Sequence, residues 1–568
     1  MNLVARAAEV KAQLTAPGAP FELAKASVGG QSLSVYRQAP DNLVQMINKA
    51  RREDDECFLV YQDERWSYRQ FYHQVDALAS WLCRQGIEPG QRVAIAMRNR
   101  PEWVVAFVAV SLMGGVPAPL NSFGLEEELR SSLDDLQAKL LICDTDRLRR
   151  LQGDTGTSNC NVLLVGGNPE LSIDDTNSII VTDYQTAVSE PAEPLPIIEI
   201  QPEDPALVLF TSGASSRAKA VVSSQRAVCQ ALYNIDYISA ISAMTSPDAV
   251  ARIQAAARLP VILTAVPLFQ VSGLHAQLLT ALRTGRRLVF MHRWDPETAV
   301  EMIKAEQVTQ FNGAPSMVMQ LLREESFLKP DVLEGFAGLG FGGAGLSQSL
   351  IEKVLKQLPE QMVGIGFGMT ESNGVGSAAS GKLFRLQPSS SGVVSPLMDV
   401  QVCSVEGKAL AAGETGEIWL RGATIMDGYL NNPSATRDAF QDGWLRTGDL
   451  GYLDENGFLF IVDRLKDVIN RAGENIAAAE VESCLAKHPT VLEAAVFGVP
   501  DEETGEAIVA VVSVSPEVEV EESALQAHVA EHLAGYKVPS KVHIMQESLP
   551  HNPAGKLLKA QLKKAFMA

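Results

Sequence analysis

Short apolar runs rich in β-branched residues alternate with longer helical patterns from about Arg92 onward, and this alternation restricts the folds open to the chain. Runs of this kind predict buried strands. Strands separated by helices are typical of a largely parallel sheet covered on both faces, so we expect an α/β fold. The predicted strands span residues 92–97, 139–143, 161–165, 206–210, 261–266 and 287–291, and predicted helices span residues 295–306 and 350–357.

The chain has 568 residues, which is more than a single hydrophobic core usually serves, so at least two domains are expected. Strands at 398–404 and 416–422 indicate a β-rich subdomain. After a charged connector the pattern predicts helix 478–488, strands 495–499 and 507–514, and helix 521–533, which together make a small α+β domain. We place the domains at residues 1–463 and 464–568, with a hinge at Lys466.

Composition excludes several classes of function. A net charge of -20 argues against binding nucleic acid or an anionic membrane surface. The seven cysteines show no CxxC pair and no His/Cys cluster at metal spacing, and dispersed thiols fit a reducing compartment. The apolar run 103–120 is interrupted by glycines and prolines, so it predicts a buried helix followed by a strand rather than a membrane span. We expect a cytoplasmic protein with no transmembrane segment and no nucleic-acid partner.

Residues 209–221 read LFTSGASSRAKAV, a strand that runs into a loop rich in hydroxyl groups. Hydroxyls, backbone N–H groups and one ammonium group after a strand suit nucleotide phosphates. The spacing of a Walker A loop is absent, and a polar surface loop is the alternative for this block alone. The candidate phosphate-binding residues are Thr211, Ser212, Gly213, Ser215 and Lys219.

Two glycine-rich segments, 341–346 (FGGAGL) and 364–372 (GIGFGMTES), favour close approach of a flat ligand to the backbone. In the second segment a ring, a hydroxyl and a carboxylate follow one another, which suits a base, a phosphate and Mg²⁺. Tight packing and a solvated glutamate are the alternative for either block alone. The candidates are Phe367 and Gly368 for the base, Thr370 for the α-phosphate, Glu371 for Mg²⁺, and Gly343 and Ala344 for space beside the sheet.

The richest segment is 446–482, in which Asp449 is placed to accept bonds from two ribose hydroxyls and Arg464 to meet an anion or a hydroxyl pair. Near the C-terminal end, residues 549–556 read LPHNPAGK. Prolines restrict this backbone, and Gly555 lets it turn so that Lys556 projects as a point charge. A solvated surface lysine is the alternative reading of Lys556.

Taken in order, these blocks resemble the acyl-CoA synthetases of the adenylate-forming superfamily, over nearly the whole chain from residues 66–68 to Lys556. The resemblance implies a large N-terminal domain of two mixed sheets with helices plus a β-barrel-like subdomain, and a small mobile α+β C-terminal lid. It implies an AMP-forming acid–thiol ligase in which a carboxylate attacks ATP to give acyl-adenylate, and CoA then displaces AMP. ATP, Mg²⁺ and CoA are the implied cofactors.

The same resemblance assigns roles to residues. Lys556, Thr370 and Glu371 form the implied catalytic group, with Lys556 between the carboxylate and the α-phosphate. Rotation at Lys466 then withdraws Lys556 from the site. The implied CoA-facing residues after that rotation are Gly473, Glu474 and Asn475.

The substrate is expected to be a medium- or long-chain fatty acid or another bulky apolar acid. Acetate-specific relatives close the pocket with a tryptophan at the position of Gly368, where this chain has no side chain. The other lining candidates carry no fixed charge for an amino group or a second carboxylate. The expected acyl-pocket residues are Phe269, Val271, Gly273, Ala314, Gly368 and Met369.

The phosphate loop departs from the family pattern TSGTTGxPKG followed by histidine. The altered positions are Ala214, Ser216, Ala218, Ala220 and Gln225, and Gln270 replaces the histidine usual after Pro-Leu-Phe. We expect Lys219 and the hydroxyls to sustain ATP binding. Two alternatives remain: an acyl-AMP ligase that donates to a separate carrier protein, and a weakly active nucleotide- or acyl-binding homologue. The sequence leaves a homodimer open.

Overall fold

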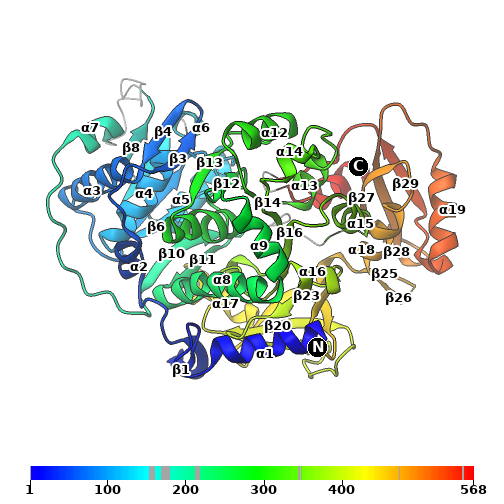
Figure 1. The fold of residues 1–568 in the computed structure, drawn as a ribbon. Helices are drawn as coiled ribbons and strands as arrows, with labels where there is room; N and C mark the ends of the chain where they lie inside the picture. Colours follow the sequence, from blue (N-terminus) through cyan, green and yellow to red (C-terminus); the bar gives the residue numbers. More distant parts are fainter. Residues whose placement is uncertain are drawn as a thin grey trace.

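The computed structural model of the chain describes residues 2–151, 160–167, 180–211, 218–342, 346, 348–472, 474–552 and 555–567. Their strands form six sheets, and helices cover the two largest parallel ones (Figure 1). None of the described helices is long and apolar enough to cross a bilayer. Six candidate site residues lie outside the described residues: Ser212, Gly213, Ser215, Gly343, Ala344 and Gly473.

The largest sheet has nine strands in the order β18-β17-β16-β15-β14-β12-β13-β3-β4. Strands β16 to β3 run parallel, and the flanking β17, β18 and β4 pair antiparallel. The bounds are β3 Cys57–Tyr61, β4 Glu64–Ser67, β12 Val261–Thr264, β13 Arg287–Phe290, β14 Gln310–Gly313, β15 Gly338–Phe341, β16 Met362–Phe367, β17 Ser377–Ser380 and β18 Val393–Val394. The alternation therefore begins before Arg92, because β3 and β4 join this sheet.

A second sheet is wholly parallel, in the order β6-β5-β7-β8-β9. The run 103–120 forms a buried helix and a strand as predicted, because every residue of helix α4 (Pro101–Leu112) is buried against this sheet and its neighbours. Proline at the first helical position costs α4 no hydrogen bond. The strands are β5 Arg92–Ala96, β6 Val116–Pro119, β7 Leu140–Asp144, β8 Asn161–Val165 and β9 Val181–Asp183.

The predicted strand 206–210 belongs to neither parallel sheet. It forms β10 (Pro205–Phe210), which pairs antiparallel with β11 (Ala220–Ser224), and β11 pairs antiparallel with β21 (Gly428–Tyr429). The prediction that this strand joins a parallel sheet is therefore wrong. An apolar run indicates a buried strand, but it does not indicate which strands pair with it. The β-rich subdomain is a five-stranded antiparallel sheet of β19 Met398–Cys403, β20 Gly416–Gly422, β22 Phe440–Gln441, β23 Trp444–Leu453 and β24 Leu459–Arg464.

The elements after the turn Leu465–Asp467 form a sheet of their own and gather on one side of the molecule, orange to red in Figure 1. Strand order is β26-β25-β28-β27, with β29 parallel to β28. Helix α18 ends at Leu485 rather than at residue 488. The bounds are β25 Ile469–Arg471, β26 Glu474–Ile476, β27 Val491–Asp501, β28 Gly505–Val514, β29 Lys541–Met545, α18 Ala478–Leu485, α19 Glu522–His532 and α20 Lys559–Met567.

The remaining helices cover the faces of the parallel sheets and shape the ends of a central cavity. The long helix α8 (Gln225–Thr245) starts at the Ser224 cap, whose hydroxyl accepts a hydrogen bond from Ala227 N. Helix α1 (Leu3–Thr15) packs on α8, and its Val10 is fully buried there. Other bounds are β1 Leu23–Val28, β2 Gln31–Tyr36, α2 Leu43–Ala50, α3 Tyr68–Arg84, α9 Pro247–Ala255, α12 Pro296–Ala305, α13 Pro315–Leu321 and α15 Gln348–Gln357.

Candidate active site

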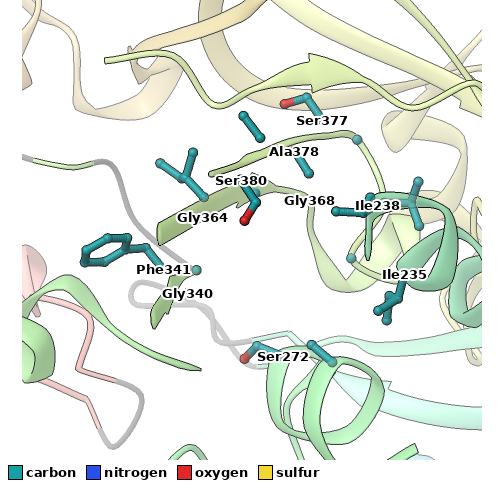
Figure 2. Close-up of a pocket in the computed structure, with 18 of the residues that line it drawn as sticks. Ile235, Ile238, Ser272, Gly340, Phe341, Gly364, Gly368, Ser377, Ala378 and Ser380 are labelled. Carbon is teal, nitrogen blue, oxygen red and sulfur yellow. The ribbon is translucent and has the colours of Figure 1, made fainter. Parts of the chain in front are cut away.

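A cavity of about 1120 Å³ lies between helix α8 and the face of strands β14, β15 and β16. Gly340 of β15 and Gly364 of β16 line it on the strand side together with Phe341 and Ser380, and Ile235 and Ile238 of α8 form another wall (Figure 2). A side chain at Gly340 would place its Cβ 2.3 Å from Asn312 Oδ1. These glycines therefore make room for neighbouring side chains, Asn312 at Gly340 and Ser380 at Gly364.

Asp449 and Arg464 face each other across the antiparallel pair β23–β24, and Arg464 Nε lies 2.6 Å from Asp449 Oδ1. Asp449 is only 2% exposed, and its Oδ2 has no hydrogen-bond partner among the described residues. Burial raises the pKa of Asp449, although Arg464 and Lys556 act in the opposite direction. A buried, unpartnered carboxylate oxygen needs a donor, which fits the ribose hydroxyls of a nucleotide.

Glu371 lies in a one-turn 3-10 helix after β16 and is buried. Its Oε1 accepts a hydrogen bond of 2.8 Å from the Tyr429 hydroxyl, while Oε2 has no partner among the described residues. Burial, followed by the charge of Glu371, raises the pKa of Tyr429 well above its ordinary value, so Tyr429 stays a donor. A free carboxylate oxygen in this position fits a hard cation such as Mg²⁺.

Lys219 and Thr211 close the neck of the phosphate loop. Lys219 N donates to Thr211 Oγ1 at 3.1 Å, and Thr211 N donates to Lys219 O at 3.0 Å. Lys219 Nζ lies 4.7 Å from the centre of the Tyr429 ring, so one ring connects the lysine to Glu371. Thr370 lies in the same 3-10 turn as Glu371 and lines the cavity.

Lys556 reaches this centre from the C-terminal elements. Gly555 has φ +76°, its carbonyl accepts a bond of 3.1 Å from Ser316 Oγ, and an added Cβ would lie 2.6 Å from Ala314 Cβ. Lys556 lines the cavity together with Arg464 and Lys466. Burial, then the charges of Arg464 and Lys466, lower the pKa of Lys556 to about 8.

A second cavity of about 1100 Å³ runs between the C-terminal elements and the rest of the chain. It shares Gly368, Arg464, Lys466 and Lys556 with the first cavity, and Asp449 and Phe367 lie along it. The candidate base, ribose and acyl residues therefore meet at Lys556.

The acyl-pocket candidates divide. Val271, Ala314, Gly368 and Met369 line the cavity, whereas Phe269 and Gly273 are not among its lining residues. Phe269 packs against Phe123. Gly273 packs closely on the preceding backbone, because a Cβ there would lie 2.3 Å from Pro267 O. Gly368 opens no space either, because its Cβ would lie 2.3 Å from the Gly374 backbone.

The implied CoA-facing residues are not brought to the site. Glu474 and Asn475 are exposed on the β25–β26 hairpin, and neither lines the two cavities. Gln225, at the family's histidine position, serves the fold: its Oε1 accepts from Leu43 N at 2.8 Å and its Nε2 donates to Pro205 O.

Several polar residues that line the cavity carried no sequence signal. They are His275 and Gln277 of the π-helical turn Leu274–Leu279, Gln310 and Asn312 of β14, Asn373, and Arg286 before β13. The predicted acyl-pocket residues carry no fixed charge, but the structure adds a cation to the lining, Arg286, which the sequence pattern did not mark. Tyr429 was also missed. It stands 58 residues after Glu371, so nothing in the local pattern links the two side chains.

The buried Asp449–Arg464 pair, the buried Glu371 and the two adjoining cavities fit an enzyme that binds a nucleotide. The family model described as AMP-binding enzyme matches residues 47–430, and the model described as AMP-binding enzyme C-terminal domain matches residues 480–556. The chain belongs to this family of adenylate-forming CoA ligases, which use ATP, Mg²⁺ and CoA.

Relatives and solved structures agree with this assignment. A 4-coumarate–CoA ligase of Arabidopsis thaliana is 30% identical over 90% of this chain and 88% of its own length. A second relative, from Rhodococcus jostii, is a 3-[(3aS,4S,7aS)-7a-methyl-1,5-dioxo-octahydro-1H-inden-4-yl]propanoyl:CoA ligase. It is 30% identical over 93% of this chain and 99% of its own length. The O-succinylbenzoate coenzyme A synthetase of Bacillus subtilis, solved with ATP and magnesium ion, is 28% identical over 91% and 98%, with a TM-score of 0.72.

The pKa of Lys556 predicts a pH dependence. The amine is charged below its pKa of about 8 and loses its attraction for anions above it. The kcat/KM for ATP in pyrophosphate release reports the free enzyme and should fall as pH rises through about 8. The residual activity of Lys556→Arg, whose guanidinium stays charged, should not fall there. A fall at the same pH in both proteins would contradict the assignment.

Tyr429→Phe should lower kcat/KM for ATP by about tenfold, because a hydrogen bond to a charged group contributes about 1.5 kcal/mol or more. The half-saturating Mg²⁺ concentration should rise with it. Tyr452→Phe is the matched control, because Tyr452 stacks on Phe460 away from both cavities. Equal ATP kinetics in the two variants would show that Tyr429 does not position Glu371.

Proposed function

We propose that the chain joins a bulky carboxylic acid to CoA through an acyl-adenylate, and that the acid carries a hydrogen-bond acceptor at the end far from its carboxylate. The choice of acid rests on the polar side chains of Arg286, Gln310 and Asn312, which line one end of the cavity.

In the first half-reaction an anion must approach a polyanion, so the site has to supply cations and donors. Lys556 is placed between the acyl cavity and Asp449 and supplies the central charge. Asp449 would hold the ribose, with Arg464 fixing its orientation. Thr370 would bind a phosphate oxygen, and Glu371 would hold Mg²⁺, which neutralises phosphate charge when bound.

In the second half-reaction CoA must reach the same acyl carbon. The present arrangement leaves Glu474 and Asn475 exposed and outside both cavities. We place the hinge at Lys466, inside the turn Leu465–Asp467, between domains of residues 1–463 and 464–568. Rotation there would withdraw Lys556 and bring the hairpin to the site, a domain-closure switch.

The acyl cavity is long enough for a large acid. One face of β14 and the residue just beyond it carries Gln310, Asn312 and Ala314, which all line the cavity. Ala314 lies at Gly555, and we call the opposite end, at Gln310, the deep end. At about 3.3 Å per residue, this face is roughly 13 Å long. Apolar side chains of α8 line the way. The body of the substrate is therefore apolar and bulky.

The deep end is polar. Arg286 Nη1 donates to Gln310 Oε1 at 2.9 Å, and Gln310 Nε2 lies 3.4 Å from Asn312 Oδ1. Arg286 forms no ion pair within the described ranges, and burial lowers its pKa. A desolvated cation facing a cavity favours an acceptor on the ligand, such as a hydroxyl, carbonyl or carboxylate oxygen.

A medium- or long-chain fatty acid is the second candidate. The apolar wall of α8, with Ile235 and Ile238, supports it. The two candidates differ in whether Arg286 receives a partner from the substrate.

Matched acids separate the candidates. With Mg-ATP and CoA, ω-hydroxydecanoate should exceed decanoate in kcat/KM by about tenfold, and 4-coumarate should exceed cinnamate, because a hydrogen bond to Arg286 contributes about 1.5 kcal/mol. Pyrophosphate release and thioester formation are both measured. Higher values for decanoate and palmitate would establish the fatty acid instead, and pyrophosphate release without thioester would indicate a carrier protein as acceptor.

Arg286→Met should remove the preference for the hydroxylated acids and leave decanoate turnover within about twofold. Arg385→Met is the control, because Arg385 also lacks an acidic partner among the described residues and donates to Leu358 O and Gln361 O, yet does not line the cavity. Retention of the preference in Arg286→Met would contradict the proposed recognition.

A further inference from the structure

Helices α18 and α19 pack against each other and bring Cys484, His528 and His532 together. The thiol and one ligand nitrogen of each histidine all lie within 4.8 Å of one another. Cys484 is buried, His528 is half-buried and His532 is exposed. His528 and His532 stand four residues apart on α19, but Cys484 comes from α18, so spacing along the chain did not reveal the cluster.

Hydrogen bonds fix which nitrogen each histidine presents. His528 Nε2 lies 3.0 Å from Cys484 O, and His532 Nδ1 lies 2.8 Å from His528 O. A carbonyl only accepts, so both nitrogens carry the proton and donate. The lone pairs are left on His528 Nδ1 and His532 Nε2. Metal-binding histidines characteristically donate their other N–H to a carbonyl or carboxylate in this way.

The bond from His528 to Cys484 O has a structural use, because it joins α19 to the last turn of α18 and adds a further donor to a carbonyl that also accepts from Lys487 N at 3.1 Å. That use accounts for one histidine nitrogen. It does not account for the convergence of the Cys484 thiol with the second histidine.

The donor set selects the ion. One thiolate and two imidazoles suit a borderline-soft divalent ion such as Zn²⁺, and they do not suit Mg²⁺ or Ca²⁺. The donor atoms around a tetrahedral Zn²⁺ ion lie roughly 3.5 Å apart. Side-chain movements of about 1 Å would therefore bring the three donor atoms to the distances that Zn²⁺ requires. The ring of His488 packs against His528, with centroids 5.1 Å apart, but its Nδ1 lies 2.8 Å from Thr490 Oγ1, so water would take the fourth position.

We propose that Cys484, His528 and His532 form a Zn²⁺ site that fastens α18 to α19. Cys484 and His532 line the second cavity, so the ion is reachable from the groove beside the C-terminal elements. Helix α18 also carries Glu482, whose Oε1 pairs with Lys559 Nζ at 2.6 Å. The ion would thus stiffen the elements that deliver Lys556, without entering the reaction.

The test uses the full-length, untagged protein. Zn²⁺ is titrated against a chromophoric chelator, and Co²⁺ is titrated by absorption spectroscopy. We expect one ion per chain, a thiolate-to-cobalt charge-transfer band, and a rise in Tm with Zn²⁺. Cys484→Ser should abolish that band, and His532→Ala should weaken Zn²⁺ binding by at least about tenfold.

His73→Ala and Cys83→Ser are the matched controls, because they remove an exposed histidine and a half-buried cysteine outside the cluster. Both should bind Zn²⁺ as the unmodified chain does. Circular dichroism and metal-free Tm show whether each variant is folded. The site is refuted if the unmodified chain binds no stoichiometric Zn²⁺, or if folded Cys484→Ser and His532→Ala bind it unchanged.

Discussion

The contact of Gly555 with Ala314 and Ser316 decides whether the two parts of the catalytic centre meet. The acyl cavity and Glu371 belong to the large sheets, whereas Lys556 belongs to the C-terminal elements. At φ +76°, with an added Cβ only 2.6 Å from Ala314, the backbone at Gly555 approaches as closely as a residue without a side chain allows. In the proposed reaction, this approach would place the ammonium group of Lys556 beside both anionic substrates.

The same contact places Lys556 among buried charged groups that act on its pKa in opposite directions. Burial, followed by the charges of Arg464 and Lys466, lowers the pKa of Lys556, and Asp449 acts against them. Nucleotide phosphates would add the missing negative charge, so the empty arrangement is electrostatically incomplete and ligand binding completes it. The thioester step of the proposed reaction would need a different arrangement, and the C-terminal elements join the rest through the short turn Leu465–Asp467, where we propose the hinge.

Much of this arrangement was predictable from the sequence, because apolar runs mark buried strands and polar residues within them mark a site. The strand at 161–165 has the predicted bounds, and Asp449 and Arg464 prove to be cross-strand neighbours. Long-range packing was not predictable: Tyr429 meets Glu371 through β21, and Arg286 joins Gln310 through neighbouring strands. The bareness of Gly368 suggested open space, but backbone from Gly374 fills it.

The most direct test of the account separates the half-reactions in Gly555→Ala. A left-handed backbone costs a residue with a side chain about 1 to 2 kcal/mol, and the contact with Ala314 adds to this cost. Adenylate formation, followed as pyrophosphate release, should therefore slow by about tenfold or more. Thioester formation from pre-formed acyl-adenylate and CoA should stay within about twofold of the unmodified chain. Equal slowing of both steps, or of neither, would contradict a docked Gly555 as the determinant of the first step alone.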